Sequence, residues 1–217
     1  MPSNSAPFII IPQKVQTMTP SNQKLMRDIL FWSGGKDSLL ALRYLQDESD
    51  GDPVLLTTFD DESGRVPHQN IPVETIRRQA LDLGLILYTI PLSYPASNKE
   101  YLNTLANHLD QFPFGVRRLV FGDLHLQDIR EWREEQFGAM GYDLHFPIWQ
   151  KPYGELLGRL EHDNVSIRIS AVMDEFSDQI QPGSEFNRRF TNSLPEEVDK
   201  MGENGEFHTE VTVLVKQ

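Results

Sequence analysis

An eight-residue segment between an apolar run and an amphipathic run constrains the fold of this chain more than any other feature. It reads Phe-Trp-Ser-Gly-Gly-Lys-Asp-Ser (residues 31–38), after a predicted buried strand at residues 28–32 and before a predicted helix at residues 39–46. Two adjacent glycines let the backbone approach an anion closely, and successive N–H groups can form a nest for it. The helix that follows directs its positive end to the same point. The segment therefore predicts a strand–loop–helix unit that binds phosphate.

The side chains of this segment support the same interpretation. Ser33 and Ser38 add hydroxyl donors and Lys36 adds a positive charge, whereas Asp37 could hold Mg²⁺ or cap the helix. A glycine turn with a capping Asp or Ser is the alternative. The spacing matches neither the Walker pattern nor the dinucleotide-binding GxGxxG pattern. We therefore expect a phosphate-binding loop formed by six residues, of which Asp37 does not contact phosphate directly: Ser33, Gly34, Gly35, Lys36, Asp37 and Ser38.

The rest of the chain alternates short apolar runs with segments of helical periodicity. Further strands are expected at residues 54–59, 85–92, 118–121 and 165–171, and further helices at residues 73–83, 98–112, 126–140 and 153–162. Strands that alternate with helices predict an α/β fold with a mostly parallel sheet and right-handed crossovers. Residues 60–70 are polar, contain Gly and Pro, and predict a loop.

Composition divides the chain into three parts. Residues 1–24 are rich in Pro, Ser and Asn, and predict a mobile leader with a short strand at residues 8–11 that could pair with a sheet edge. An organellar transit peptide is the alternative for this leader, although the segment contains no Arg. Residues 25–141 are expected to form the nucleotide-binding domain. Residues 142–217 are expected to form a small substrate lobe with a final strand near residues 207–215.

Charge and cysteine content exclude several classes of function. The chain contains no cysteine, which excludes disulfides, thiolate metal ligands and a cysteine nucleophile. Its net charge of −12 disfavours nonspecific binding to nucleic acid or an anionic membrane, and no apolar run reaches the length of a membrane helix. We therefore expect a cytoplasmic protein, with a homodimer possible. No zinc site is expected, because no metal-ligand spacing relates His108, His125, His145 and His162.

The loop at residues 33–38 resembles the PP-loop of the ATP pyrophosphatases, which cleave ATP between the α and β phosphates. The resemblance implies a doubly wound, Rossmann-like sheet of the adenine nucleotide alpha-hydrolase type. It also implies that the loop holds the β,γ-pyrophosphate of ATP while a substrate oxygen attacks the α-phosphorus. The adenine is then expected near Thr57 and Phe59 and near residues 85–87, and Asp37 is expected to help hold Mg²⁺.

Three further segments narrow the resemblance. Phe-Gly-Asp-Leu (121–124), Pro-Ile-Trp (147–149) and Gly-Glu-Asn-Gly-Glu-Phe-His-Thr (202–209) resemble, in this order, the diphthine–ammonia ligase family, and the last segment is more similar to its bacterial-type branch. The resemblance implies ATP-dependent amidation. A carboxylate attacks the α-phosphorus, pyrophosphate leaves, and ammonia then displaces AMP to give an amide. The implied partners are ATP, Mg²⁺, ammonia and a small-molecule or protein carboxylate. Because the chain has neither a cysteine nor room for a glutaminase, ammonia is expected free or from another protein.

Catalysis is expected from five side chains: Lys36, Asp123, Glu203, Glu206 and His208. Positive charge at Lys36 suits the α-phosphate and the leaving pyrophosphate. Glu203 and Glu206 flank an Asn-Gly pair and could present carboxylates to a cleft, although a tight hairpin turn is the alternative. Asp123 follows a predicted strand, where ligands bind in open α/β folds, or it is a structural cap. His208 could act as a base or contact the substrate.

Substrate binding is expected from six further positions: His68, Arg130, Trp149, Asn204, Gly205 and Thr209. His68 lies in a predicted loop. Arg130 lies on a densely charged helix, for which a solvated face is the usual explanation. Trp149 follows a proline and could line a pocket, but a buried aromatic residue is the alternative.

Two other functions stay open on the sequence alone. One is a regulatory module that binds ATP or AMP without turnover, and the other is a tRNA-modifying PP-loop enzyme. Residues 202–209 have no evident role in a sensor, and the lack of cysteine and the negative charge disfavour the tRNA enzyme. After residue 209 the chain departs from the family's usual continuation, so the end of the acceptor site is expected to differ.

Overall fold

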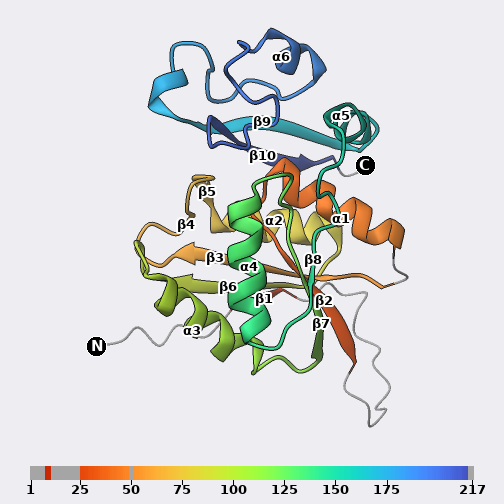
Figure 1. The fold of residues 1–217 in the computed structure, drawn as a ribbon, viewed down its shortest axis with the longest axis vertical. Coiled ribbons are helices and arrows are strands. Elements are labelled where there is room, and N and C mark those ends of the chain that lie inside the picture. The colour runs from red at the N-terminus through yellow and green to blue at the C-terminus, as the bar shows by residue number, and fades with distance from the viewer. Residues whose placement is uncertain (1–7, 11–24, 49–50, 215–217) are drawn as a thin grey trace.

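The computed structural model describes residues 8–10, 25–48 and 51–214 (Figure 1). Of the predicted leader at residues 1–24, residues 8–10 are described, and the remainder of the leader lies outside the described residues. The end of the predicted last strand, at residue 215, also lies outside them.

A six-stranded sheet forms the centre of the molecule. Its strand order is β1-β6-β3-β2-β7-β8, and neighbouring strands run parallel except β1, which pairs antiparallel with β6 at one edge. The strands are β1 (Phe8–Ile10), β2 (Met26–Phe31), β3 (Val54–Asp60), β6 (Leu87–Leu92), β7 (Gly115–Val120) and β8 (Leu144–His145). The mostly parallel sheet and the edge strand at residues 8–10 confirm two predictions. Strand β8 was not predicted, because two half-buried residues carry no readable pattern.

Helices cover both faces of this sheet, which confirms the doubly wound α/β fold. They are α1 (Lys36–Glu48), α2 (Val73–Leu83), α3 (Asn98–Leu109) and α4 (Gln127–Ala139). Successive strand residues point to opposite faces. Leu30 therefore joins the core under α1 and α2, while Ile29 joins the core under α3 and α4. Burial on both faces explains why these strands read as nearly continuous apolar runs.

A second sheet has two antiparallel strands, β9 (Val165–Val172) and β10 (Phe207–Val213). It is accompanied by α5 (Tyr153–Glu161), a 3₁₀ turn (Asp174–Phe176) and α6 (Arg188–Ser193). The strand expected at residues 165–171 is β9, and it pairs with β10 in this small sheet instead of joining the parallel sheet. Strand β9 buries Ile167 and Ile169 and exposes Arg168 between them. This one-sided pattern is typical of an antiparallel strand with one solvated face.

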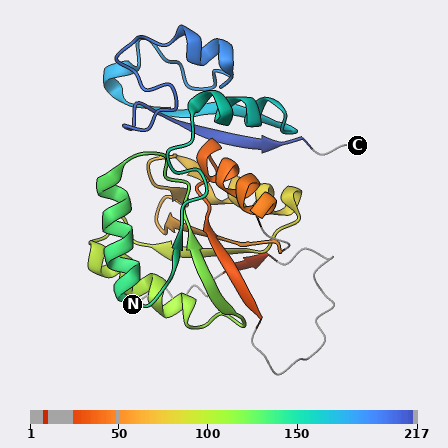
Figure 2. The same ribbon diagram turned by 45° about the vertical axis from the view of Figure 1, so that its right-hand side comes forward.

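Strand β10 connects the two sheets. It packs against α1 and α2, and its residue Val211 shares one hydrophobic core with Leu39 of α1 and Ile76 of α2. Figure 2 shows the small sheet, α5 and α6 together on one side of the large sheet, with β10 next to α1. The predicted boundary at residue 141 stays a prediction, and β8 lies beyond it although it belongs to the large sheet.

The predicted loop at residues 60–70 contains part of a small hairpin, β4 (Arg65–Val66) and β5 (Ile71–Pro72). The turn of this hairpin contains His68 and Gln69. It lies close to the small sheet, because the side-chain nitrogen of Gln69 is 3.4 Å from Nδ1 of His208 in β10. The hairpin therefore brings a third segment to the place where the two sheets meet.

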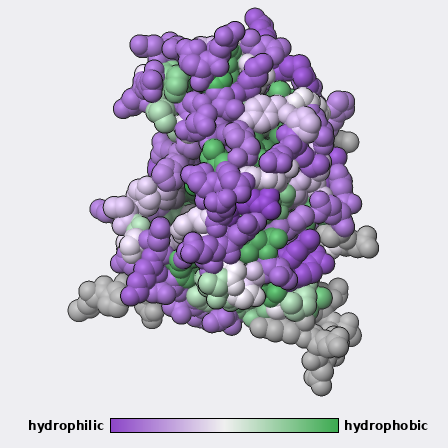
Figure 3. Space-filling model, in the orientation of Figure 1, coloured by the Kyte–Doolittle hydropathy of each residue, from purple (hydrophilic) through white to green (hydrophobic). Residues whose placement is uncertain are grey.

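The surface in view in Figure 3 is largely hydrophilic, with small and scattered hydrophobic areas. Within the part of the chain that the structure describes, no helix has the length and apolar character needed to cross a bilayer.

Candidate active site

A cavity of about 320 Å³ opens at the carboxyl ends of β2, β3 and β7, where ligands bind in open α/β sheets. Its volume lies at the lower end of the range typical of small-molecule sites. Four residues that precede or begin β10 line it from the side of the small sheet: Gly202, Glu203, Gly205 and His208. The cavity brings together eight of the predicted site residues: Ser33, Asp37, Ser38, Thr57, Asp123, Glu203, Gly205 and His208.

Close packing requires glycine at both glycine positions of the loop. Gly34 has a φ of 83°, and a Cβ there would lie 2.4 Å from Ile76 Cδ1 in α2. A Cβ on Gly35 would lie 3.0 Å from the carbonyl oxygen of Thr209 in β10. The loop is therefore held between α2 and β10, which fixes the path of its backbone.

Gln79 of α2 connects the loop with the end of β2 and with β10 through hydrogen bonds. Its side chain accepts a hydrogen bond from Trp32 Nε1 (2.8 Å) and donates to the carbonyl oxygens of Gly34 (3.1 Å) and Val211 (2.7 Å). The sequence analysis gave Gln79 no role in the site. Its position was readable in principle, because Gln79 lies three residues after Ile76, on the buried face of the helix.

Hydroxyl groups stabilise the start of α1. Ser38 Oγ donates to the carbonyl oxygen of Gly35 (2.9 Å) and lies 3.3 Å from Ser33 Oγ. The backbone N–H of Lys36 donates to Thr209 Oγ1 (3.0 Å). Thr209, expected to bind substrate, is buried and holds the loop backbone. It is not among the described residues that line the cavity.

Lys36 does not occupy the place expected for a phosphate ligand. Its ammonium lies 2.7 Å and 2.9 Å from the two carboxylate oxygens of Asp37. It also lies 5.7 Å from the ring centroid of Phe186, in the small lobe, and its side chain is buried. Lys36 is not among the described residues that line the cavity, although its charge acts on the lining residues Glu203 and His208.

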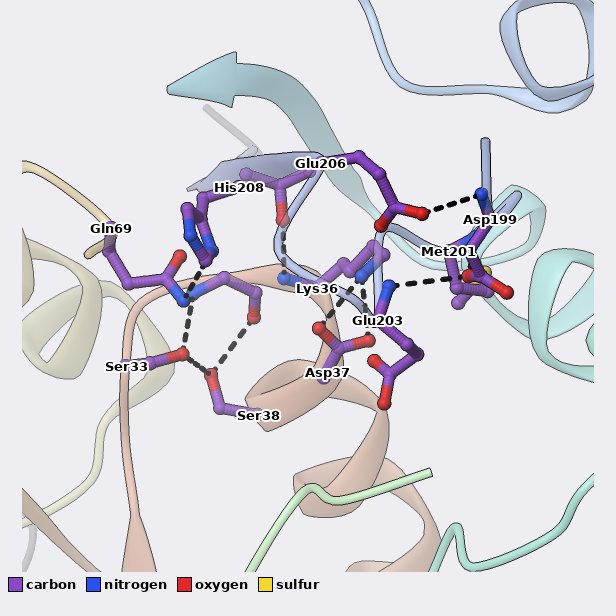
Figure 4. Close-up of polar contacts among 12 residues, drawn as sticks. Ser33, Lys36, Asp37, Ser38, Gln69, Asp199, Met201, Glu203, Glu206 and His208 are labelled. Atoms are coloured by element: carbon purple, nitrogen blue, oxygen red, sulfur yellow. Dashed lines mark hydrogen bonds and ion pairs between the residues drawn. The ribbon is translucent and has the colours of Figure 1, made fainter. Parts of the chain in front are cut away.

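Three carboxylates face the cavity: Asp37, Asp123 and Glu203. Figure 4 shows the side chains of Asp37 and Glu203 turned towards one another. Burial raises the pKa of Asp37 against the opposing effect of Lys36. Burial, reinforced by the charge of Asp37, raises the pKa of Glu203 to about 8. A bound cation would relieve this crowding of like charges.

The donor set of the cavity fits Mg²⁺. Mg²⁺ prefers hard oxygen ligands and is usually held by one or two carboxylates together with substrate phosphates. Asp37 and Asp123 supply carboxylates beside the loop. Among the described residues, no three His, Cys, Asp or Glu side chains converge as a closed metal site. An ion shared between the protein and a nucleotide fits this arrangement better than an all-protein cage.

Asp123 is held in place by Arg133 of α4. The guanidinium contacts both carboxylate oxygens, with Nε 2.7 Å from Oδ2 and Nη2 3.2 Å from Oδ1. It also lies 4.3 Å from the ring centroid of Phe121. Arg133 lines the cavity, so it brings a fixed positive charge to a site that is otherwise rich in carboxylates.

The segment before β10 is organised by Asp199. Its carboxylate accepts hydrogen bonds from the N–H groups of Met201 (2.8 Å) and Glu203 (3.3 Å) and from the hydroxyl of Tyr153 (2.8 Å). These bonds fix the backbone at Glu203, and its carboxylate then points at the cavity. The sequence analysis did not single out Asp199 or Tyr153, since their pairing depends on tertiary structure.

Glu206 was expected to be catalytic, but its carboxylate binds the backbone of the turn that precedes β10. Its buried carboxylate accepts hydrogen bonds from the N–H of Asp199 (2.9 Å) and from the N–H and side-chain amide of Asn204 (both 3.0 Å). Figure 4 shows Glu206 turned towards Asp199, away from Asp37. Neither Glu206 nor Asn204 is among the described residues lining the cavity. Both hold the turn that presents Glu203 and Gly205.

His208 lines the cavity from β10. Burial, reinforced by the charge of Lys36 and by His68, lowers the pKa of His208 to about 4. The ring is therefore neutral near pH 7. His68 is exposed and lies at the mouth, with its ring centroid 6.4 Å from that of His208 and its Nε2 3.5 Å from the hydroxyl of Tyr94.

Two expected substrate residues form a separate surface cluster. The guanidinium of Arg130 lies 4.7 Å from the ring centroid of Trp149 and 4.8 Å from that of Phe146, and it pairs with Glu134 at 2.7 Å. Neither Arg130 nor Trp149 is among the described residues that line the cavity. The structure therefore does not bring them to the loop, and their role in substrate binding stays a prediction.

Near the end of β3, the cavity is lined by the residues that precede Phe59. Thr57 lines the cavity and donates from Oγ1 to the carbonyl oxygen of Trp32 (2.6 Å). Thr58 also lines it, whereas Phe59 is not among the lining residues described. Tyr101, from α3, is a further lining residue that sequence reasoning missed, and burial raises its pKa.

Comparison with known proteins identifies a family for the first part of the chain. A sequence model described as Diphthamide synthase N-terminal domain matches residues 26–141, just over half of the chain. The solved structure of a predicted subunit of tRNA methyltransferase from Methanocaldococcus jannaschii is 17% identical, with a TM-score of 0.46. That match covers 88% of this chain and 98% of the other. No curated protein sequence matches the chain.

Proposed function

Because the chain belongs to the family of the diphthamide synthase N-terminal domain, we propose that it is an ATP-using enzyme that joins a carboxylate to ammonia. The proposal extends the family assignment to a carboxylate–ammonia ligase of the diphthine–ammonia ligase type, in its bacterial-type branch. The observation that carries it is the cavity, in which Ser33 and Ser38 of the loop face the same space as the carboxylates of Asp37, Asp123 and Glu203.

The nucleotide end of the cavity is built from the loop and its flanking strands. Ser33, Ser38 and the loop backbone bind the β and γ phosphates, and Thr57 lies at the side expected for the adenosine. Asp37 and Asp123 hold Mg²⁺, which neutralises charge on the phosphates when bound. Arg133 is the cationic side chain that the cavity offers to the phosphate oxygens.

The first reaction step is adenylation. An oxygen of the acceptor carboxylate attacks the α-phosphorus, the bond between the α-phosphorus and its bridging oxygen breaks, and pyrophosphate leaves. Backbone N–H groups of the loop and Arg133 stabilise the negative charge that develops on the leaving group. The buried ion pair of Lys36 and Asp37 keeps the first turn of α1 in place for this step.

The second step is aminolysis of the acyl-adenylate. Ammonium must lose a proton before its nitrogen can attack the acyl carbon, and the C–O bond to AMP then breaks. Glu203 suits this proton transfer, because the raised pKa of about 8 makes its carboxylate a stronger base, and the ionised fraction that can accept the proton grows as the pH approaches 8. Glu203 reaches the cavity on the turn held by Glu206 and Asp199.

The partners in this proposal are a small-molecule or protein carboxylate, and ammonia that arrives free or from another protein. The net charge of −12 supports the absence of nucleic-acid and membrane partners. We also propose that the protein forms a homodimer and is located in the cytoplasm.

The test is AMP formation from ATP and Mg²⁺ with a panel of carboxylates, with and without ammonium. We expect AMP and pyrophosphate with at least one carboxylate, and loss of both products in Asp37→Asn. Asp178→Asn removes an exposed acid of the small lobe and is the matched control. Nucleotide binding without AMP would indicate a regulatory module, and turnover only with tRNA would indicate an RNA-modifying enzyme. Either outcome overturns the proposal.

A further inference from the structure

Gln69 lies between the phosphate loop and His208. It comes from the turn of the β4–β5 hairpin, and its amide nitrogen lies 3.4 Å from His208 Nδ1. The other end of the amide faces the loop, because Gln69 Oε1 would lie 3.2 Å from a Cβ on Gly35. Both Gln69 and His208 line the cavity. One side chain thus contacts the loop and the small sheet together.

The chemistry of this contact defines the tautomer of His208. Because a carboxamide nitrogen can only donate, this contact is a hydrogen bond when Nδ1 of His208 accepts with its lone pair. A neutral imidazole carries one ring proton, which therefore lies on Nε2. The charged or titratable groups that act on the ring are Lys36 of α1 and His68 of the hairpin, and both favour the neutral ring.

We infer that Gln69 is a positioning residue that holds His208 as the neutral Nε2–H tautomer, so that His208 donates a hydrogen bond within the cavity instead of acting as a base. The fitting ligand group is an anionic or carbonyl oxygen, as on a phosphate or an acyl-phosphate. With Nδ1 occupied and Nε2 protonated, the ring has no free lone pair, which leaves Glu203 as the base of the proposed reaction.

A second observation supports a positioning role for Gln69. Within the described part of the chain, Gln69 Oε1 is buried without a hydrogen-bond partner. Buried acceptors of this kind are uncommon and tend to occur at functional sites. Oε1 therefore stays available to a donor in the cavity, while the amide nitrogen contacts His208.

The direct test is ¹⁵N NMR of the histidine side chains in the full chain without nucleotide, with the His208 signals identified by their loss in His208→Gln. We expect a proton on Nε2 in the wild type. Gln69→Glu places an acceptor opposite Nδ1, so it is expected to move the proton to Nδ1 or to charge the ring. Gln181→Glu makes the same change at an exposed site and is expected to leave His208 unchanged. A wild-type proton on Nδ1 would overturn the inference.

The role as a donor rests on the proposed function and is tested separately. Where Gln69→Glu moves the proton from Nε2 to Nδ1, it is expected to lower kcat for AMP formation by about 10²-fold, as for the loss of one oxyanion donor, with a smaller change in KM. A charged ring keeps its Nε2–H and is expected to keep kcat. An unchanged kcat in a variant whose tautomer has moved would overturn the donor role. If the wild type formed no AMP, the proposed function would fail, and the NMR result would still decide the tautomer.

Discussion

Lys36 is the residue whose place in the structure differs most from the expectation for a phosphate loop. It is the first residue of α1, and its ammonium turns to Asp37 and Phe186 under the small lobe. The residue next to it in the chain, Asp37, faces the cavity instead. One position along the helix therefore decides whether a side chain faces the cavity or pairs with the residue that does.

Lys36→Met tests this supporting role. The change leaves Asp37 without its partner in a site where its side chain is 27% exposed, so we expect a loss of about 1–3 kcal/mol in the free energy of unfolding. Lys36→Met combined with Asp37→Asn removes the unpaired charge and is expected to recover much of that stability without recovering AMP formation. Urea denaturation measures both.

The expectation would be contradicted if Lys36→Met were as stable as the wild type and lost nucleotide affinity alone. That result would indicate a direct contact between Lys36 and phosphate.

At the scale of elements, the strand–loop–helix unit was predictable from the sequence because its cause is local. Gly34 and Gly35 permit the turn, and the apolar runs on both sides form β2 and α1. The partner of β9 and the role of Glu206 were not predictable. The pairing of β9 with β10 depends on chain segments that are brought together only when the small lobe folds. The bonds to Glu206 come from Asp199 and Asn204 within one turn, and they depend on a turn geometry that the residue types alone do not specify.

Glu206→Gln tests the turn that precedes β10. An amide has one acceptor oxygen in place of two, so at least one of the three donors that bind Glu206 loses its partner. We expect a loss of about 1–3 kcal/mol and faster hydrogen exchange at residues 199–206. Exchange measured by NMR or mass spectrometry reports this directly.

Glu197→Gln makes the same substitution at an exposed site of the same lobe and serves as the control. Equal exchange at residues 199–206 in both variants would show that Glu206 does not hold the turn.

At the scale of the whole molecule, the site exists only where the two sheets meet. The large sheet supplies the loop, Asp37 and Asp123, whereas Glu203 and His208 come from the small lobe. Since β10 packs on α1 and α2, folding of the small lobe and closure of the cavity are one event. The protonation of Glu203 is therefore coupled to global stability.

The pH dependence of stability follows from this coupling. The pKa of Glu203 is about 8 in the folded chain and near the ordinary glutamate value of 4.5 when the chain is unfolded. Between these values the folded state binds more protons than the unfolded state, so this group's contribution to stability is lost as pH rises through about 8. We expect the Tm of the wild type in EDTA to fall between pH 6.5 and 8.5, and Glu203→Gln to fall less. Parallel curves would contradict the buried, protonated Glu203.

The central claim is that an oxygen of the acceptor carboxylate attacks the α-phosphorus of ATP in the cavity. The measurement is mass spectrometry of AMP formed from ATP, Mg²⁺ and ammonium with ¹⁸O-labelled carboxylates. Adenylation followed by aminolysis predicts one ¹⁸O atom in each AMP, together with pyrophosphate. Unlabelled AMP, or ADP with orthophosphate, would contradict the account.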